Sequence, residues 1–388
     1  MIAALYSKRR ATKDVFIRNF IADASGAAVF VYPKNRRDEV PDLPGVYCVA
    51  YEDVTKTTTW LHINSIMDSG STLVLENPSR YPKITSEKFG HLKRLSMQVA
   101  HKAIVDIVPF TLDTEYLYTP LAYLDRGILG YAHYYAWREN YHERGDDGIV
   151  RAAHDPDVIA PKLAEVAHID YRRFLCANRT TIDVQTMPDE HESYAAKKSE
   201  LFAEYDSPQR IVTRLADHTH AFESRRQALY QLLPLPGRTV IYTNLSSYAT
   251  RLRADLKAQG LHKSVTVTSY QTGDSGEADN CIYFESPIVN SYYLLDAESK
   301  LPEAARVYHF LSDAKVDRLL YDTVTSELEQ IDELTQELWH EQENRERLQG
   351  LSDEERLAGG TGAHGMDLRY VQDSERVRVW RQGQQRHV

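Results

Sequence analysis

The sequence of 388 residues contains few cysteines and no long hydrophobic run. Its three cysteines, Cys48, Cys176 and Cys281, are an odd number without C-x-x-C spacing, which excludes a disulfide framework and a thiolate zinc site. The longest apolar stretch, residues 27–32, is too short to cross a bilayer, so no membrane association is expected. No apolar leader segment follows Met1, and these features together predict a protein of the reducing cytoplasm.

An excess of positive charge is also lacking. The net charge is −10, and residues 326–388 carry much of it, with 8 arginines against 14 acidic residues. A nucleic-acid-binding protein usually has a basic domain, so phosphate contacts would depend on local basic runs. For the runs at residues 8–10 and 34–37, a solvated surface and a phosphate contact remain equally open interpretations.

The first 150 residues alternate short apolar runs with helical segments. The runs consist of β-branched and aromatic residues bounded by turn residues, at positions 27–32, 46–51, 72–75 and 103–108. Runs of this length are typical of strands that are covered by helices on both faces of a parallel sheet. We therefore expect an α/β lobe over residues 1–150, followed by a helical connector over residues 151–233.

A second α/β pattern follows at residues 234–325. Strands are predicted at 238–243, 264–270, 280–284 and 305–311, with an amphipathic helix at 247–259. Residues 326–388 are predicted to form an acidic helix and a flexible tail. In this helix, apolar residues three or four positions apart form a stripe, which predicts packing on the second lobe or on a protein partner. The stripe consists of Leu328, Ile331, Leu334, Leu338 and Trp339.

Several segments match, in order, the motifs of a motor family. Residues 29–34 end in Pro-Lys, Leu75-Glu76 stands where that family has its Asp-Glu box, and residues 239–244 end in an asparagine. Residues 270–276 match a loop that senses ATP and touches DNA. Residues 5 to about 325 thus resemble the core of a superfamily 2 helicase of the Snf-type DNA translocase branch, in the small form often carried by bacteriophages.

The resemblance implies a fold of two RecA-like lobes in tandem, with ATP and magnesium bound between them and DNA as a partner. It assigns Thr12 and Lys13 to the nucleotide, and Glu76 and Lys300 to catalysis. The residues that it assigns to nucleic acid are Lys34, Asn244, Gly273, Ser275 and Gly276. We expect Lys13, Glu76, Gly273 and Lys300 to line a cleft between the lobes. No resident metal site formed by protein side chains alone is expected.

The sequence departs from the family's catalytic pattern at nearly every motif. In the phosphate-loop segment, Ser7 and Thr12 stand in place of glycines, and Asp14 replaces the hydroxyl that binds magnesium. Leu75 replaces the magnesium carboxylate. Lys300 replaces one arginine without its planar fork, and Glu303 reverses the charge of the other. Binding of ATP with magnesium is therefore doubtful.

These features favour a DNA-associated, helicase-like accessory or scaffold protein with a weak or lost ATPase. One alternative is an active ATP-dependent helicase or translocase with diverged motifs. Another is an interaction protein that mimics or blocks a host helicase-type factor, in the host cytoplasm if a phage encodes it. Residues 327–355, with 11 acidic residues against Arg345 and Arg347, are the candidate partner segment. The His218 and His220 pair is better explained by a surface helix than by a metal site.

Overall fold

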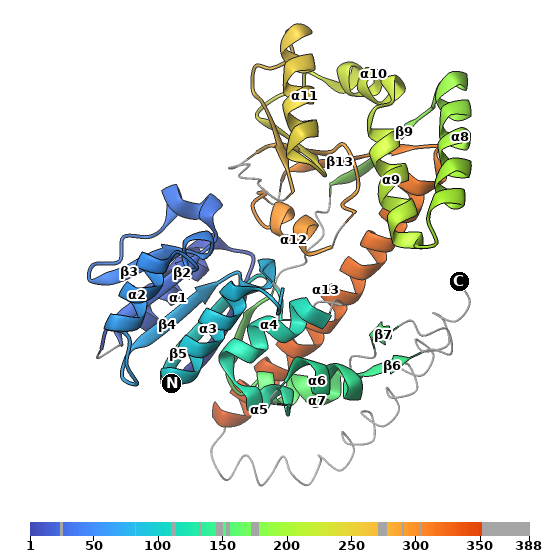
Figure 1. The fold of residues 1–388 in the computed structure, drawn as a ribbon. Helices are drawn as coiled ribbons and strands as arrows, with labels where there is room; N and C mark the ends of the chain where they lie inside the picture. Colours follow the sequence, from blue (N-terminus) through green and yellow to red (C-terminus); the bar gives the residue numbers. More distant parts are fainter. Residues whose placement is uncertain are drawn as a thin grey trace. The chain divides into compact units, whose positions relative to one another are not determined.

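The computed structural model describes residues 1–23, 26–81, 83–109, 114–131, 133–144, 150–152, 156–171, 178–270, 278–288, 291–302 and 304–350. Its first sheet has six parallel strands in the order β3-β2-β4-β5-β1-β8. Figure 1 labels β2, β3, β4 and β5 of this sheet. The strands are β1 (Ile2–Ser7), β2 (Ala28–Tyr32), β3 (Val46–Ala50), β4 (Thr72–Glu76), β5 (His101–Asp106) and β8 (Ala167–Asp170). Four of these strands follow the predicted apolar runs, whereas β1 and β8 were not predicted.

The first sheet is hydrophobic on both faces, as parallel sheets covered by helices are. Every residue of β2 and β4 is buried. On one face, Leu5, Phe30 and Val74 pack against Ile17 and Phe20 of α1. The helices of this part of the chain are α1 (Arg10–Ala22), α2 (Thr57–Ile66), α3 (Glu87–Gln98), α4 (Thr114–Leu124), α5 (Arg126–Leu129), α6 (Tyr134–Tyr141) and α7 (Pro156–Leu163).

Short 3₁₀ helices and one hairpin complete this half. The 3₁₀ helices are η1 (Lys34–Glu39), η2 (Tyr51–Asp53) and η3 (Pro78–Arg80). Strands β6 (His142–Arg144) and β7 (Val150–Ala152) pair with each other in antiparallel fashion. The tyrosine-rich segment before β6 is used mainly for packing, since Tyr118, Tyr134 and Trp137 are buried and their rings lie in contact.

The second sheet has five parallel strands in the order β11-β10-β12-β13-β9. They are β9 (Arg179–Val184), β10 (Thr239–Thr243), β11 (Val265–Ser269), β12 (Asn280–Tyr283) and β13 (Arg306–Ser312). Its helices are α8 (Pro188–Glu204), α9 (Pro208–His220), α10 (Glu223–Leu232), α11 (Ser246–Ala258), α12 (Tyr292–Glu298) and α13 (Lys315–Gly350). The segment predicted as a helical connector therefore also holds one strand of each sheet, β8 and β9.

Alternate residues of the second sheet's strands serve two separate cores, as the period of two of a strand requires. Ile241 and Ile282 pack with α10 and α11 residues, whereas Val240 and Cys281 pack on the opposite side with α12 and α13 residues. Each of the two consecutive halves of the chain is thus a parallel sheet covered by helices. The chain has the predicted two RecA-like α/β lobes.

Helix α13 uses its apolar stripe inside the chain itself. Leu328 and Ile331 are 1% and 0% exposed, and they pack in one cluster with Tyr292 of the second lobe and with Ile107 and Val108 of the first. The stripe predicted to pack on the second lobe or on a partner is therefore covered, at these residues, by both lobes. None of the described helices is long and apolar enough to cross a membrane.

Candidate functional site

Four neighbouring strands of the first sheet end in polar residues. Strands β4, β5, β1 and β8 end at Glu76, Asp106, Ser7 and Asp170. The four strands are parallel, so these side chains lie along one edge, the carboxyl edge, where α/β sheets bind their ligands. This edge contains the positions that the sequence assigns to the nucleotide.

The loop between β1 and α1 is bound to a carboxylate of the chain itself. Ser7 Oγ donates a hydrogen bond of 2.8 Å to Asp170 Oδ2, and Thr12 Oγ1 donates one of 3.0 Å to the same atom. Arg9 Nε lies 4.0 Å from that oxygen. In the segment that aligns with a phosphate loop, the hydroxyl groups of Ser7 and Thr12 are therefore hydrogen-bonded to the Asp170 carboxylate.

Arg36 joins the remaining acidic groups of this segment. Its guanidinium forms ion pairs with Asp14 and with Glu76, whose side chain is only 2% exposed. Burial is the main influence on Arg36 and lowers the pKa of its guanidinium, which the neighbouring Asp14 partly counteracts. The carboxylate predicted to orient a water molecule is thus the partner of a buried arginine.

Lys13 lies on α1 and is 5% exposed. Its Nζ donates a hydrogen bond of 3.1 Å to Asn77 Oδ1. Asn77 follows β4 with φ of 47°, a left-handed conformation that asparagine tolerates better than most residues. Burial lowers the pKa of Lys13 from 10.5 to about 8, although Asp106 and Asp296 oppose this shift. Part of the Lys13 population is therefore uncharged at mildly alkaline pH.

Residues of the second lobe reach this edge through α12. Tyr292 Oη donates a hydrogen bond of 2.7 Å to Asp106 Oδ1, and Asp106 also accepts from the Ser79 and Ile107 backbone N–H groups. Burial is the main influence on Asp106 and raises the pKa of its carboxyl. Its hydrogen-bond donors and Lys13 oppose that shift.

Asp296 is the second inter-lobe contact. Arg80 of η3 lies 2.5 Å from its Oδ2, and Lys300 Nζ lies 3.5 Å from the same atom. Burial alone would raise the pKa of the Asp296 carboxyl, but Lys300, Arg80 and Lys13 outweigh it and hold this pKa below its usual value. Lys13 and Lys300 thus act on one buried carboxylate. The catalytic and nucleotide roles assigned to them stay predictions.

We expect Tyr292→Phe to lower the free energy of unfolding by about 1 to 3 kcal/mol, because a buried carboxylate loses a donor without gaining water. The control is Tyr293→Phe, at the next residue of α12. The Tyr293 hydroxyl has no hydrogen bond to a described residue, so its removal should change the free energy of unfolding by less than about 0.5 kcal/mol. Urea unfolding of both variants, followed by circular dichroism, measures the difference. Equal midpoints for the two variants would contradict the importance of the Asp106 contact.

The basic runs at residues 8–10 and 34–37, whose role the sequence left open, are largely paired with acidic side chains. Arg10 pairs with Glu39, and Arg37 donates to Asp53 at 2.9 Å. Arg9 and Arg36 face Asp170 and Asp14, as described above. Lys34 is exposed, and its backbone N–H donates to Glu52 at 3.2 Å. These runs therefore provide less positive charge to a phosphate strand than their sequence indicates.

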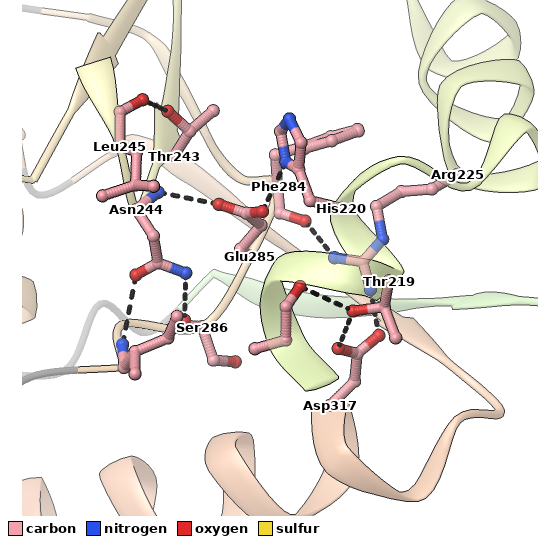
Figure 2. A network of polar contacts seen from close by, with 12 residues as sticks. Thr219, His220, Arg225, Thr243, Asn244, Leu245, Phe284, Glu285, Ser286 and Asp317 are labelled. Atoms are coloured by element: carbon pink, nitrogen blue, oxygen red, sulfur yellow. Dashed lines mark hydrogen bonds and ion pairs between the residues drawn. The ribbon is translucent and has the colours of Figure 1, made fainter. Parts of the chain in front are cut away.

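The predicted nucleic-acid residue Asn244 follows β10 at the carboxyl edge of the second sheet (Figure 2). Its Nδ2 donates to Ser286 O at 3.0 Å, and its Oδ1 accepts from the Ile288 N–H at 3.1 Å. Its own N–H donates to Glu285 Oε2 at 2.7 Å. The Asn244 amide thus holds the segment after β12 in place, and its assignment to nucleic acid stays a prediction.

His220 pairs with Glu285 in the same network (Figure 2). Its ring is stacked on Tyr248, with 3.7 Å between the centroids, and the residue is 8% exposed. The expected surface position of the histidine pair is wrong for His220, because α9 lays this residue over the carboxyl edge of the second sheet. Among the described residues, no group of three or more potential metal ligands is found.

Three of the predicted nucleic-acid residues, Gly273, Ser275 and Gly276, and also Glu303, lie outside the described residues. The structure adds residues that sequence reasoning did not select. Asp170 gave no signal because β8 was not recognised as a strand. Arg36 was noticed only within the basic run at residues 34–37, and Asp296 was not selected, because the partners of both are remote in sequence.

The solved structures that resemble the chain include a SWI2/SNF2 ATPase core and a helicase domain. One is the Sulfolobus solfataricus SWI2/SNF2 ATPase core in complex with dsDNA, with a TM-score of 0.37, 12% identity and coverage of 92% of each chain. The other is the Pyrococcus furiosus Hef helicase domain, with a TM-score of 0.41, 10% identity and coverage of 83% of this chain and 94% of that one. No family model and no curated protein sequence matches.

The two tandem parallel sheets agree with the two α/β lobes expected from the sequence. The chain folds as two tandem parallel α/β lobes. The carboxyl edge of the first lobe meets α12 of the second through Asp106 and Asp296.

Proposed function

We propose that the chain is a helicase-like protein of the Snf-type branch that associates with DNA as an accessory or scaffold component and does not turn over ATP. The observation that carries this proposal is the internal pairing at the expected nucleotide position. There, Asp170 holds Ser7 and Thr12, and Arg36 holds Asp14 and Glu76.

The chemistry of phosphoryl transfer explains why this pairing matters. Catalysis needs amides and a lysine on the phosphates, carboxylate and hydroxyl ligands on magnesium, and a free carboxylate to orient water. Asp170 and Asp14 place negative charge where ATP phosphates would have to enter, and Leu75 offers no ligand to magnesium. The residues present do not fit ATP with magnesium.

DNA association is the part of the proposal that the family resemblance contributes. One of the similar structures holds double-stranded DNA, and we extend DNA association to this chain as a proposal. The acidic balance of the chain and the paired basic runs lead us to expect moderate affinity that falls with salt.

The test of this proposal is ATP hydrolysis measured with and without DNA, in the natural chain and in Lys13→Ala. We expect both proteins to show the same background rate, and calorimetry to find no micromolar binding of magnesium ATP. Loss of an arginine finger alone lowers such rates about 10³- to 10⁵-fold. Fluorescence anisotropy with labelled oligonucleotides measures the DNA association in parallel.

A DNA-stimulated rate on the order of one per second that disappears in Lys13→Ala would overturn the loss of ATP turnover and favour the active helicase. Absence of both ATP turnover and DNA binding would instead overturn the DNA part of the proposal.

A further inference from the structure

A pocket of about 520 Å³ lies along one face of α9 in the second lobe. It is lined by Tyr205, which caps α8, and by Arg210, Thr213, Arg214 and Asp217 of α9. The α9 residues recur at intervals of three and four, so they occupy one face of the helix. Ligand pockets in proteins have volumes of roughly 300 to 1,000 Å³, which includes this one.

The two arginines of this pocket differ from those of the first lobe's basic runs. Both arginines are exposed and form no ion pair or hydrogen bond to a described residue, although Arg214 lies close enough to Asp217 to oppose the rise that burial causes in the pKa of that carboxyl. They are four residues apart, so their guanidinium groups can approach one anion together. Arginine forks match the oxygens of a phosphate group particularly well.

The remaining lining residues offer an aromatic ring and polar groups. Tyr205 packs against the cluster of Leu201, Ile211 and Leu215, which limits the ring's freedom. Two acidic groups lie at or near the pocket: Glu204 raises the pKa of the Tyr205 hydroxyl, and Asp217 lines the pocket itself. Burial raises the pKa of the Asp217 carboxyl, and Glu285 adds to this shift.

We propose that this pocket binds one nucleotide unit of a single-stranded nucleic-acid segment, with the phosphate on Arg210 and Arg214 and the base against Tyr205. Thr213 and Asp217 provide hydrogen-bonding groups for the polar edge of the base or for the sugar. Stacking of a base on an aromatic ring next to a cationic phosphate contact is the common arrangement for single strands. The inference rests on the proposed function, because it specifies where a nucleic-acid strand binds.

The pocket is connected to the carboxyl edge of the second sheet through consecutive contacts. Burial and the nearby Asp217 raise the pKa of Tyr248, whose ring stacks on His220. His220 pairs with Glu285, which in turn accepts from the Asn244 N–H (Figure 2). A strand bound at the pocket therefore lies beside the sheet edge to which the sequence assigned a nucleic-acid residue.

The test is fluorescence anisotropy with a labelled single-stranded oligonucleotide over a salt series. The variant Arg210→Ala/Arg214→Ala should bind about 10-fold more weakly at low salt, and its dependence of log affinity on log salt should be shallower by about 0.7 per lost phosphate contact. The matched control is Arg18→Ala/Arg226→Ala, which removes the same charge from an exposed position on α1 and a partly exposed one on α10. We expect this control to keep the affinity within about two-fold, since it leaves the pocket intact.

A competition experiment distinguishes a nucleic-acid phosphate from a free phosphate compound as the ligand. Unlabelled oligonucleotide should displace the probe, and inorganic pyrophosphate at the same phosphate concentration should not. Displacement by pyrophosphate alone at that concentration would overturn the assignment to a nucleic-acid strand.

The failures of the two proposals are distinguishable. If the natural chain binds the oligonucleotide and both double variants bind it equally well, the pocket assignment is wrong and DNA association stands. If the natural chain binds no oligonucleotide, the proposed DNA association fails and the pocket assignment fails with it.

Discussion

Replacing Arg225 by alanine should lower the free energy of unfolding of the second lobe by about 3 to 5 kcal/mol. Arg225 is 1% exposed, pairs with Asp317 and donates to Phe284 O at 2.5 Å (Figure 2). Removing the guanidinium leaves the Asp317 carboxylate buried, with Thr219 and Ser312 as its remaining hydrogen-bond donors among the described residues. An uncompensated buried charge is among the most costly single changes in a protein.

The adjacent residue offers the control. Arg226 lies one position further on α10, and its pair with Glu223 lies at the surface, where the Arg226 side chain is 31% and the Glu223 side chain 47% exposed. We expect Arg226→Ala to cost less than about 1 kcal/mol, as exposed pairs do. The midpoints of urea unfolding, followed by circular dichroism, measure both variants, and a loss below about 1 kcal/mol for Arg225→Ala would show that water reaches Asp317.

Most of the fold could be predicted because parallel strands leave a strong local signal. Residues 27–32, 72–75 and 239–243 are near-continuous apolar runs, and each became a strand with buried faces. Strands β8 and β9 carry no such signal. β8 mixes polar with apolar residues, and β9 has several exposed positions, so that only pairing with β1 and β13 defines them.

The candidate site was predictable only at the level of single positions. Lys13, Glu76 and Lys300 were selected from motif order, and the structure places Lys13 and Lys300 near one buried carboxylate, Asp296. The partners of the selected residues could not be predicted. Asp170 is 163 residues from Ser7, and this contact depends on the pairing of β8 with β1.

The same limitation applies to the acidic helix. Its spacing correctly indicated an apolar face, yet it could not show that this face is shared between the lobes. A truncation after Asp322 would remove Leu328 and Ile331 from that shared core. It would therefore destabilise the fold, and a change in DNA affinity after such a truncation would not measure electrostatic repulsion alone.

The free energy of unfolding should rise with pH above pH 8, because Lys13 is buried and its pKa is lowered to about 8. Below pH 8 the ammonium is charged in both the folded and the unfolded chain, so the folded state bears the full cost of burying it. Between pH 8 and 10.5 the unfolded chain holds the proton and the folded chain does not, so stability rises with pH. Over this whole pH range, the titration of Lys13 raises the free energy of unfolding by about 3 kcal/mol.

Comparison with Lys13→Met isolates this contribution. The natural chain should gain about 2 kcal/mol relative to Lys13→Met between pH 8 and 9.5, measured by urea unfolding at constant ionic strength. The range ends there because buried tyrosines such as Tyr6 and Tyr292 have raised pKa values, mainly through burial, and oppose the trend in both proteins at higher pH. A constant difference across the range would mean that Asp106 and Asp296 keep Lys13 charged, in which case its ammonium would remain available to an anion at alkaline pH.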